Sequence, residues 1–170
     1  MRIDDHEMDL INTLESLMEK CKKCSKSKWF GEKRFIPLEW NPMSRFLIIA
    51  DDPNQITESL WHSALKYYFR KELFAIIYLS NCGFPIEDVR HKCMEYIKKF
   101  IKLIDPEVII VMGSFSHNLF LHEYGRISNA LVGNYEIELD MRYKIVAAER
   151  SWAHYDDVFR KINSILKRDR

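Results

Sequence analysis

The chain has 170 residues, of which 47% are hydrophobic and 13% aromatic, and its formal net charge at pH 7 is +1. These values exclude a disordered chain and suit one domain, residues 1–170, with one hydrophobic core. The first residues are polar and acidic, and no apolar run approaches a membrane span, so neither a signal peptide nor a transmembrane helix is expected. We therefore expect a cytoplasmic protein without membrane contact, in which cysteines stay reduced.

The first predicted element is a helix over about Asp5–Lys20. Apolar residues recur there at helical spacing, from Met8 to Met18. The helix would place Cys21, the first cysteine of a C-x-x-C motif, at its C-terminal end.

An irregular basic stretch follows this helix. Between Lys20 and Arg34 seven basic residues stand against one acidic residue, Glu32. Such a loop can neutralise phosphates, whereas a solvated surface loop is the plainer interpretation. The lysines that would contact a nucleic-acid backbone are Lys22, Lys23, Lys26 and Lys28.

Short apolar runs then alternate with helical patterns. Each run has the length of a strand and ends at a turn, which is typical of strands buried in a parallel sheet. Strands are predicted at 46–50, 74–79, 108–113, 135–139 and 144–148, and helices at about 57–71, 85–104, 114–123 and 156–167. Thr57 is expected to cap the first of these helices. The alternation predicts the α/β class, as a three-layer α/β/α sandwich around a central, mostly parallel four-stranded sheet.

All four cysteines fall in two places. Cys21 and Cys24 form the C-x-x-C motif, Cys82 precedes a predicted helix, and Cys93 lies within that helix. A redox pair usually follows a strand rather than a helix, and four unligated buried thiols are a further interpretation. Four thiolates suit zinc or a cubane iron-sulfur cluster, and the spacing alone does not separate the two.

Polar residues follow the predicted strands. In an open α/β sheet, ligands bind beyond the carboxyl ends of the strands. A carboxylate and an amide there suit hydrolysis at a nucleobase, because Asp52 would activate water and Asn81 would pair with the base. Ordinary turn chemistry is the alternative interpretation. The residues at these ends are Asp51, Asp52, Asn54, Ser80, Asn81, Gly113, Ser114, Glu149, Arg150 and Ser151.

The order of these motifs resembles the iron-sulfur uracil-DNA glycosylases, the family 4 and family 5 branch of the uracil-DNA glycosylase superfamily. That family has a helix leading to C-x-x-C, a basic stretch, a strand entering G-E-A-P-G, a strand ending T-N, two further cysteines, P-x-I-I-V-x-L-G and a late H-P-S loop. The matching features here, over nearly the whole chain, are Cys21, Cys24, 46–54, 74–81, Cys82, Cys93 and 106–113.

The resemblance implies roles for particular residues. Cys21, Cys24, Cys82 and Cys93 would bind a structural 4Fe-4S cluster, with zinc as the less expected metal. Asp52 coincides with the water-activating aspartate of the superfamily's G-Q-D-P-Y motif, and Arg150 stands where the H-P-S histidine belongs. The uracil-reading asparagine corresponds to Asn81 by the strand end, or to Tyr78 by counting back from Cys82. The base-binding group would then comprise Asp51, Asn54, Tyr78 and Asn81.

The function implied is that of a DNA glycosylase. It would bind single- or double-stranded DNA and hydrolyse the N-glycosidic bond of a flipped uracil, deaminated or modified base, as a monomer in the cytoplasm or at the nucleoid. Both glycines of G-E-A-P-G are replaced here, as is the H-P-S motif. These departures keep open a catalytically inactive DNA-binding or protein-interaction member of the same fold. A zinc-stapled α/β module unconnected with nucleic acid is a third interpretation.

Overall fold

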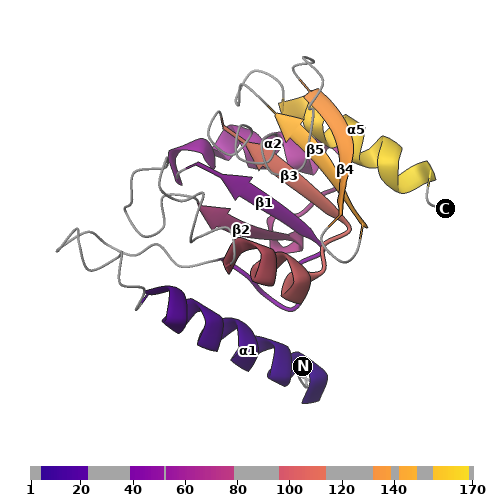
Figure 1. Cartoon of the computed structure of the whole chain (residues 1–170). Helices are drawn as coiled ribbons and strands as arrows, with labels where there is room; N and C mark the ends of the chain where they lie inside the picture. Colours follow the sequence, from indigo (N-terminus) through magenta and orange to yellow (C-terminus); the bar gives the residue numbers. More distant parts are fainter. Residues whose placement is uncertain are drawn as a thin grey trace.

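A computed structural model describes residues 5–22, 39–51, 53–78, 96–113, 132–138, 142–148 and 155–168 (Figure 1). These residues form one sheet with helices, so the α/β class predicted from the sequence is confirmed. None of the helices in these ranges is both long and apolar enough to cross a membrane.

The sheet of the described residues has five strands, in the order β2-β1-β3-β5-β4. The first four in this order are parallel, and β4 pairs antiparallel with β5. A four-stranded sheet was expected although five strand segments were predicted; all five belong to the sheet, because β4 adds to its edge by pairing antiparallel with β5. The strands are β1 (Phe46–Ala50), β2 (Phe74–Tyr78), β3 (Val108–Met112), β4 (Val132–Glu138) and β5 (Arg142–Ala148).

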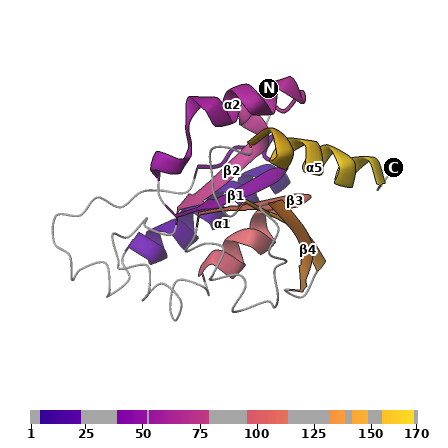
Figure 2. The same ribbon diagram turned by 90° about the horizontal axis from the view of Figure 1, so that it is seen from above.

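The strands β1, β2 and β3 are buried along their whole length. Alternate residues of each strand belong to two separate hydrophobic clusters, as the period of a strand requires. One cluster includes α1 (Asp5–Lys22) and the helix of residues 96–104, and the other includes α2 (Glu58–Lys66) and α5 (Tyr155–Arg168). Figure 2 shows these two pairs of helices on opposite sides of the sheet.

The helix ends follow local sequence rules. The Thr57 side chain accepts a hydrogen bond from the Leu60 amide at 3.4 Å and caps α2, as predicted. The helix of residues 96–104 ends at Asp105, which has a φ of 48° and donates its amide to the carbonyl of Ile101 at 2.8 Å. Pro106 follows and cannot continue the helix. Two short 3-10 turns, η2 (Pro53–Gln55) and η3 (Lys71–Leu73), flank α2.

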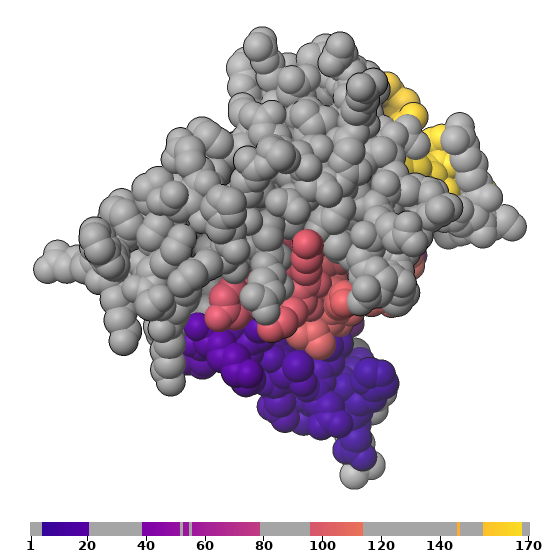
Figure 3. Space-filling view, in the orientation of Figure 1, coloured from indigo at the N-terminus to yellow at the C-terminus, as the bar shows by residue number. Residues whose placement is uncertain are grey.

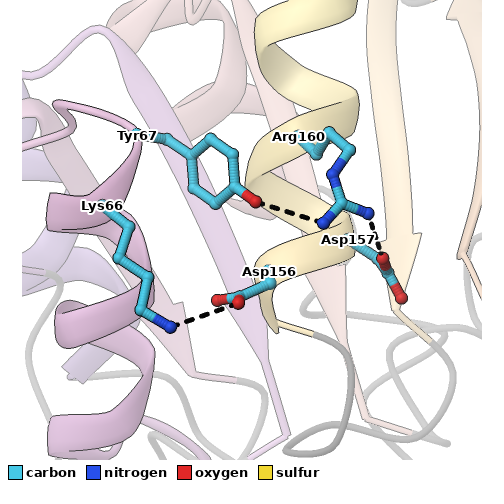
Figure 4. A network of polar contacts seen from close by, with 5 residues as sticks. All are labelled: Lys66, Tyr67, Asp156, Asp157 and Arg160. Atoms are coloured by element: carbon cyan, nitrogen blue, oxygen red, sulfur yellow. Dashed lines mark hydrogen bonds and ion pairs between the residues drawn. The ribbon is translucent and has the colours of Figure 1, made fainter.

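Polar contacts join α2 and α5 (Figure 4). Lys66 Nζ lies 3.2 Å from Asp156 Oδ2. Arg160 donates to the hydroxyl of Tyr67 at 3.3 Å and to Asp157 Oδ1 at 2.7 Å. Hydrogen bonds from Ser63 and Lys66 lower the pKa of Asp156 below its usual value. Phe159 of α5 also packs its ring against those of Phe69 and Phe74, which holds α5 against the start of β2 and the turn after α2.

Candidate functional site

The carboxyl ends of the parallel strands are aligned in one row. Ala50 at the end of β1 pairs with Tyr78 of β2 and Met112 of β3, and Met112 pairs with Ala148 of β5. The carboxyl ends of these four strands therefore lie at the same edge of the sheet. This is the edge where ligands bind in open α/β sheets.

Asp51 follows β1 directly at this edge. Its residue surface is only 6% exposed, and it is the one charged residue buried among those that the structure describes. Burying a carboxylate is costly unless polar groups or charges surround it, so buried carboxylates are candidates for functional roles. Asn54 lies in η2, three residues further on, and is exposed. Asp52 stands between them in the sequence and lies outside the described residues.

Gly113 follows β3 at the same edge. It is buried and has a φ of 95°, a conformation that a residue with a Cβ adopts only with strain. Gly113 therefore follows β3 beside the end of β1, where Asp51 lies, since β1 and β3 are neighbouring strands. This glycine ends the predicted P-x-I-I-V-x-L-G motif, and the sequence reasoning placed it correctly at a strand end.

Tyr78 ends β2 in the same row, but its hydroxyl is engaged elsewhere. The side chain is 4% exposed, and the hydroxyl donates to Glu39 Oε1 at 3.2 Å. Glu39 also forms a backbone bridge with Ile76, with amide-to-carbonyl distances of 3.0 and 2.8 Å. Burial, and then the Glu39 carboxylate, raise the pKa of Tyr78 above its usual value of 10.0. The phenol therefore stays protonated and acts as a donor to Glu39.

Glu39 was missed by the sequence reasoning. It lies in an irregular stretch 39 residues before Tyr78, and no local pattern joins the two residues. The only available signal is the acidic character of this residue just before Trp40, which is too general to identify a partner.

The remaining predicted site residues are not brought together by the described structure. Cys21 and Lys22 are the last two residues of α1, and only the backbone of these two residues is described. Within the described ranges, no three side chains capable of holding a metal ion lie together. The residues outside those ranges are Lys23, Cys24, Lys26, Lys28, Asp52, Asn81, Cys82, Cys93 and Arg150.

A hollow of about 530 Å³ lies beside α1. Leu103, from the helix of residues 96–104, contributes to its lining, and Figure 3 shows that helix and α1 side by side on the surface. The lining is largely polar and comes mostly from one side of α1, so it offers no converging set of catalytic groups. The lining residues are Asp9, Asn12, Thr13, Ser16, Leu17, Lys20 and Leu103.

The sequence was compared with family models and with curated proteins, and no family model and no curated protein matches it.

Proposed function

We propose that the chain is a DNA glycosylase of the iron-sulfur uracil-DNA glycosylase type, with its site at the carboxyl ends of β1, β2, β3 and β5. The observation that carries the proposal is the shared row of strand ends, at which the buried Asp51 and the tightly turned Gly113 lie on neighbouring strands. Helices in both hydrophobic clusters support the three-layer α/β/α sandwich of that family.

In this proposal Asp52, the residue after Asp51, performs the chemistry. Asp52 positions a water molecule against the anomeric carbon of an extruded nucleotide, and Arg150 stabilises the departing base. Asp51, Asn54 and either Asn81 or Tyr78 shape the base pocket. Lys22, Lys23, Lys26 and Lys28 neutralise phosphates on one side of it.

A structural 4Fe-4S cluster belongs to the same proposal. Its ligands would be Cys21, Cys24, Cys82 and Cys93, and the extension of α1 through Cys21 to Lys22 agrees with a ligand anchored at a helix end. The cluster would brace the DNA-facing loops and take no part in base release. Iron and sulfide analysis of protein purified without oxygen tests this assignment, because a zinc site would contain neither.

A second candidate function is DNA or protein binding without catalysis. It is favoured by the hydrogen bond of Tyr78 to Glu39, because a phenol engaged within the protein does not replace the amide that reads uracil.

One experiment separates the two functions. Iron-loaded protein is incubated with single- and double-stranded DNA containing uracil, hypoxanthine or modified cytosines, and abasic sites are scored. Release of a base establishes the glycosylase and identifies its substrate class. Salt-sensitive binding of all these DNAs without release supports the non-catalytic function and rejects the enzyme.

A further inference from the structure

The C-terminal end of α2 carries an exposed apolar surface, here called the α2 surface and consisting of Trp61, Leu65 and Tyr68. Leu65 is 56% exposed and Tyr68 is 92% exposed. Trp61 is partly buried against Phe74, with ring centroids 5.5 Å apart. Trp61 and Leu65 are four residues apart and lie on one side of α2, and Tyr68 follows two residues after the helix ends at Lys66. Figure 2 shows α2 at the outside of the molecule, on the side of the sheet opposite α1.

The backbone at Tyr68 is strained. Tyr68 has a φ of 65°, and its amide and that of Phe69 donate to the carbonyls of Leu65 and Ala64, both at 3.0 Å. This hydrogen-bond pattern ends many helices and usually has glycine at the position that Tyr68 occupies. A tyrosine there costs conformational free energy, and a ring that is 92% exposed recovers little of it by packing. A contact outside the chain would account for a tyrosine at this position.

The charges around the α2 surface are balanced. Glu58 and Glu72 are exposed, as are Arg70 and Lys71. Lys66 is already paired with Asp156. A polyanion such as nucleic acid gains no net attraction from two acidic and two basic groups, so the balance favours a partner with both charges.

A second copy of this chain carries both kinds of charge. Glu58 begins α2, whereas Arg70 and Lys71 follow its end. If two copies of α2 pack antiparallel about a twofold axis, Glu58 of each copy meets Arg70 and Lys71 of the other. The apolar Leu65 and Tyr68 then lie at the centre, where they exclude water.

We infer that the α2 surface is the interface of a symmetric dimer of this chain. The inference is independent of the proposed glycosylase activity and departs from the monomer expected from the sequence. Leu65 and Tyr68 lie shortly before Phe74, which begins β2. Because one helix end buries a modest area, the dimer is weak and depends on concentration.

Sedimentation velocity over about a hundredfold range of concentration tests this inference. The weight-average mass should rise from the chain mass of 20.4 kDa toward twice that value. Leu65→Glu and Tyr68→Ala should hold the mass at that of the monomer at every concentration. Met8→Glu, at a 44% exposed residue of α1, serves as the control and should dimerise as the unmodified protein does.

Charge reversal tests the antiparallel arrangement itself. Glu58→Lys alone and Arg70→Glu alone should each weaken the dimer, and the double variant should restore it, because each reversed charge again meets its opposite. A structural effect within one chain would not be rescued in this way. Unmodified protein that stays monomeric throughout the range would overturn the inference, as would a Met8→Glu variant that loses the dimer like Leu65→Glu. Monomeric protein whose DNA affinity falls on Tyr68→Ala would instead assign the α2 surface to nucleic acid.

Discussion

The two ends of the parallel strands differ in how their polar groups are used. At the amino end, Arg45 before β1 and Glu107 before β3 form a forked ion pair with distances of 2.8 to 3.1 Å. Backbone hydrogen bonds of 2.8 Å link Arg45 to Leu73 and Glu107 to Arg45, which ties the starts of three strands together. At the carboxyl end lie a buried carboxylate, Asp51, and a glycine at positive φ.

In the proposed function, this difference separates the residues that stabilise the fold from those that perform the chemistry. The charges at the amino end are exposed and paired with each other, so they cost little to maintain. A buried carboxylate is costly, and proteins keep such groups where they are used. Four variants, taken from the largest expected effect to the smallest, test this contrast.

Asp52→Asn should have the largest effect, on activity. If Asp52 positions the attacking water, the rate of base release should fall by about 10²- to 10⁴-fold while DNA affinity is kept. Single-turnover kinetics and DNA binding measure the two quantities. Glu15→Gln, at an exposed residue of α1, is the matched control. An unchanged rate in Asp52→Asn would remove this residue from the catalytic role.

Gly113→Ala should destabilise the fold by about 1–3 kcal/mol, because a Cβ is strained at a φ of 95° and the site is buried. Asp105, at a φ of 48° before β3, offers the matching test at the amino end. Asp105→Gly should change stability little, since relief of strain and the added freedom of the unfolded chain oppose each other. Urea denaturation compares the unfolding free energies of the two variants. Equal losses in Gly113→Ala and Asp105→Gly would contradict the difference between the two strand ends.

Tyr78→Phe should cost about 1 kcal/mol, because it removes the hydrogen bond to Glu39. It should also change the response to alkali. The raised pKa means that the folded protein keeps a proton that the unfolded chain releases above pH 10.0. This contribution to stability is therefore complete below pH 10.0 and is lost as pH rises toward the raised pKa. The free energy of unfolding, measured between about pH 8 and pH 11, should decline less steeply with pH in Tyr78→Phe than in the unmodified protein. Parallel curves would reject the pairing.

Arg45→Gln should have the smallest effect, of about 0.2–1 kcal/mol, because both partners of the ion pair are about half exposed. The loss should shrink further at high salt, where exposed charges are screened. Thermal unfolding at low and high ionic strength measures both effects. A salt-independent loss of several kcal/mol would contradict the view that the charges at the amino end contribute little to stability.

The parts of the fold that follow local rules were predictable from the sequence. The apolar run of β1 was predicted with its observed bounds, and that of β3 with its observed start and an end one residue later, because strands buried on both faces need no polar residues. Thr57 was predicted as a cap because its hydroxyl bonds to an amide three residues away. The first helix runs two residues further than expected, to Lys22, because helix ends depend on contacts beyond the helix.

The parts that depend on distant contacts were not predictable. The burial of Asp51 results from the surrounding fold, since Asp-Asp-Pro-Asn reads as an ordinary exposed turn. The antiparallel fifth strand required knowledge of the sheet order, which the pattern of β4 does not contain. The partner of Tyr78 lies 39 residues away in an irregular stretch. For the candidate site, the sequence therefore predicted which strand ends carry polar groups. It predicted no side-chain contact among these groups.

The bridge between Glu39 and Ile76 has a consequence for solubility. Among the described strands β2 is the outermost on its side of the sheet, and unpaired backbone groups at such an edge are a template for strands of other chains. Glu39 occupies both backbone groups of Ile76 and adds a carboxylate beside them. Natural proteins block exposed strands with charges and short bridging segments of this kind to prevent edge-to-edge aggregation. Loss of this segment should therefore turn β2 into a nucleation point for amyloid-like stacking.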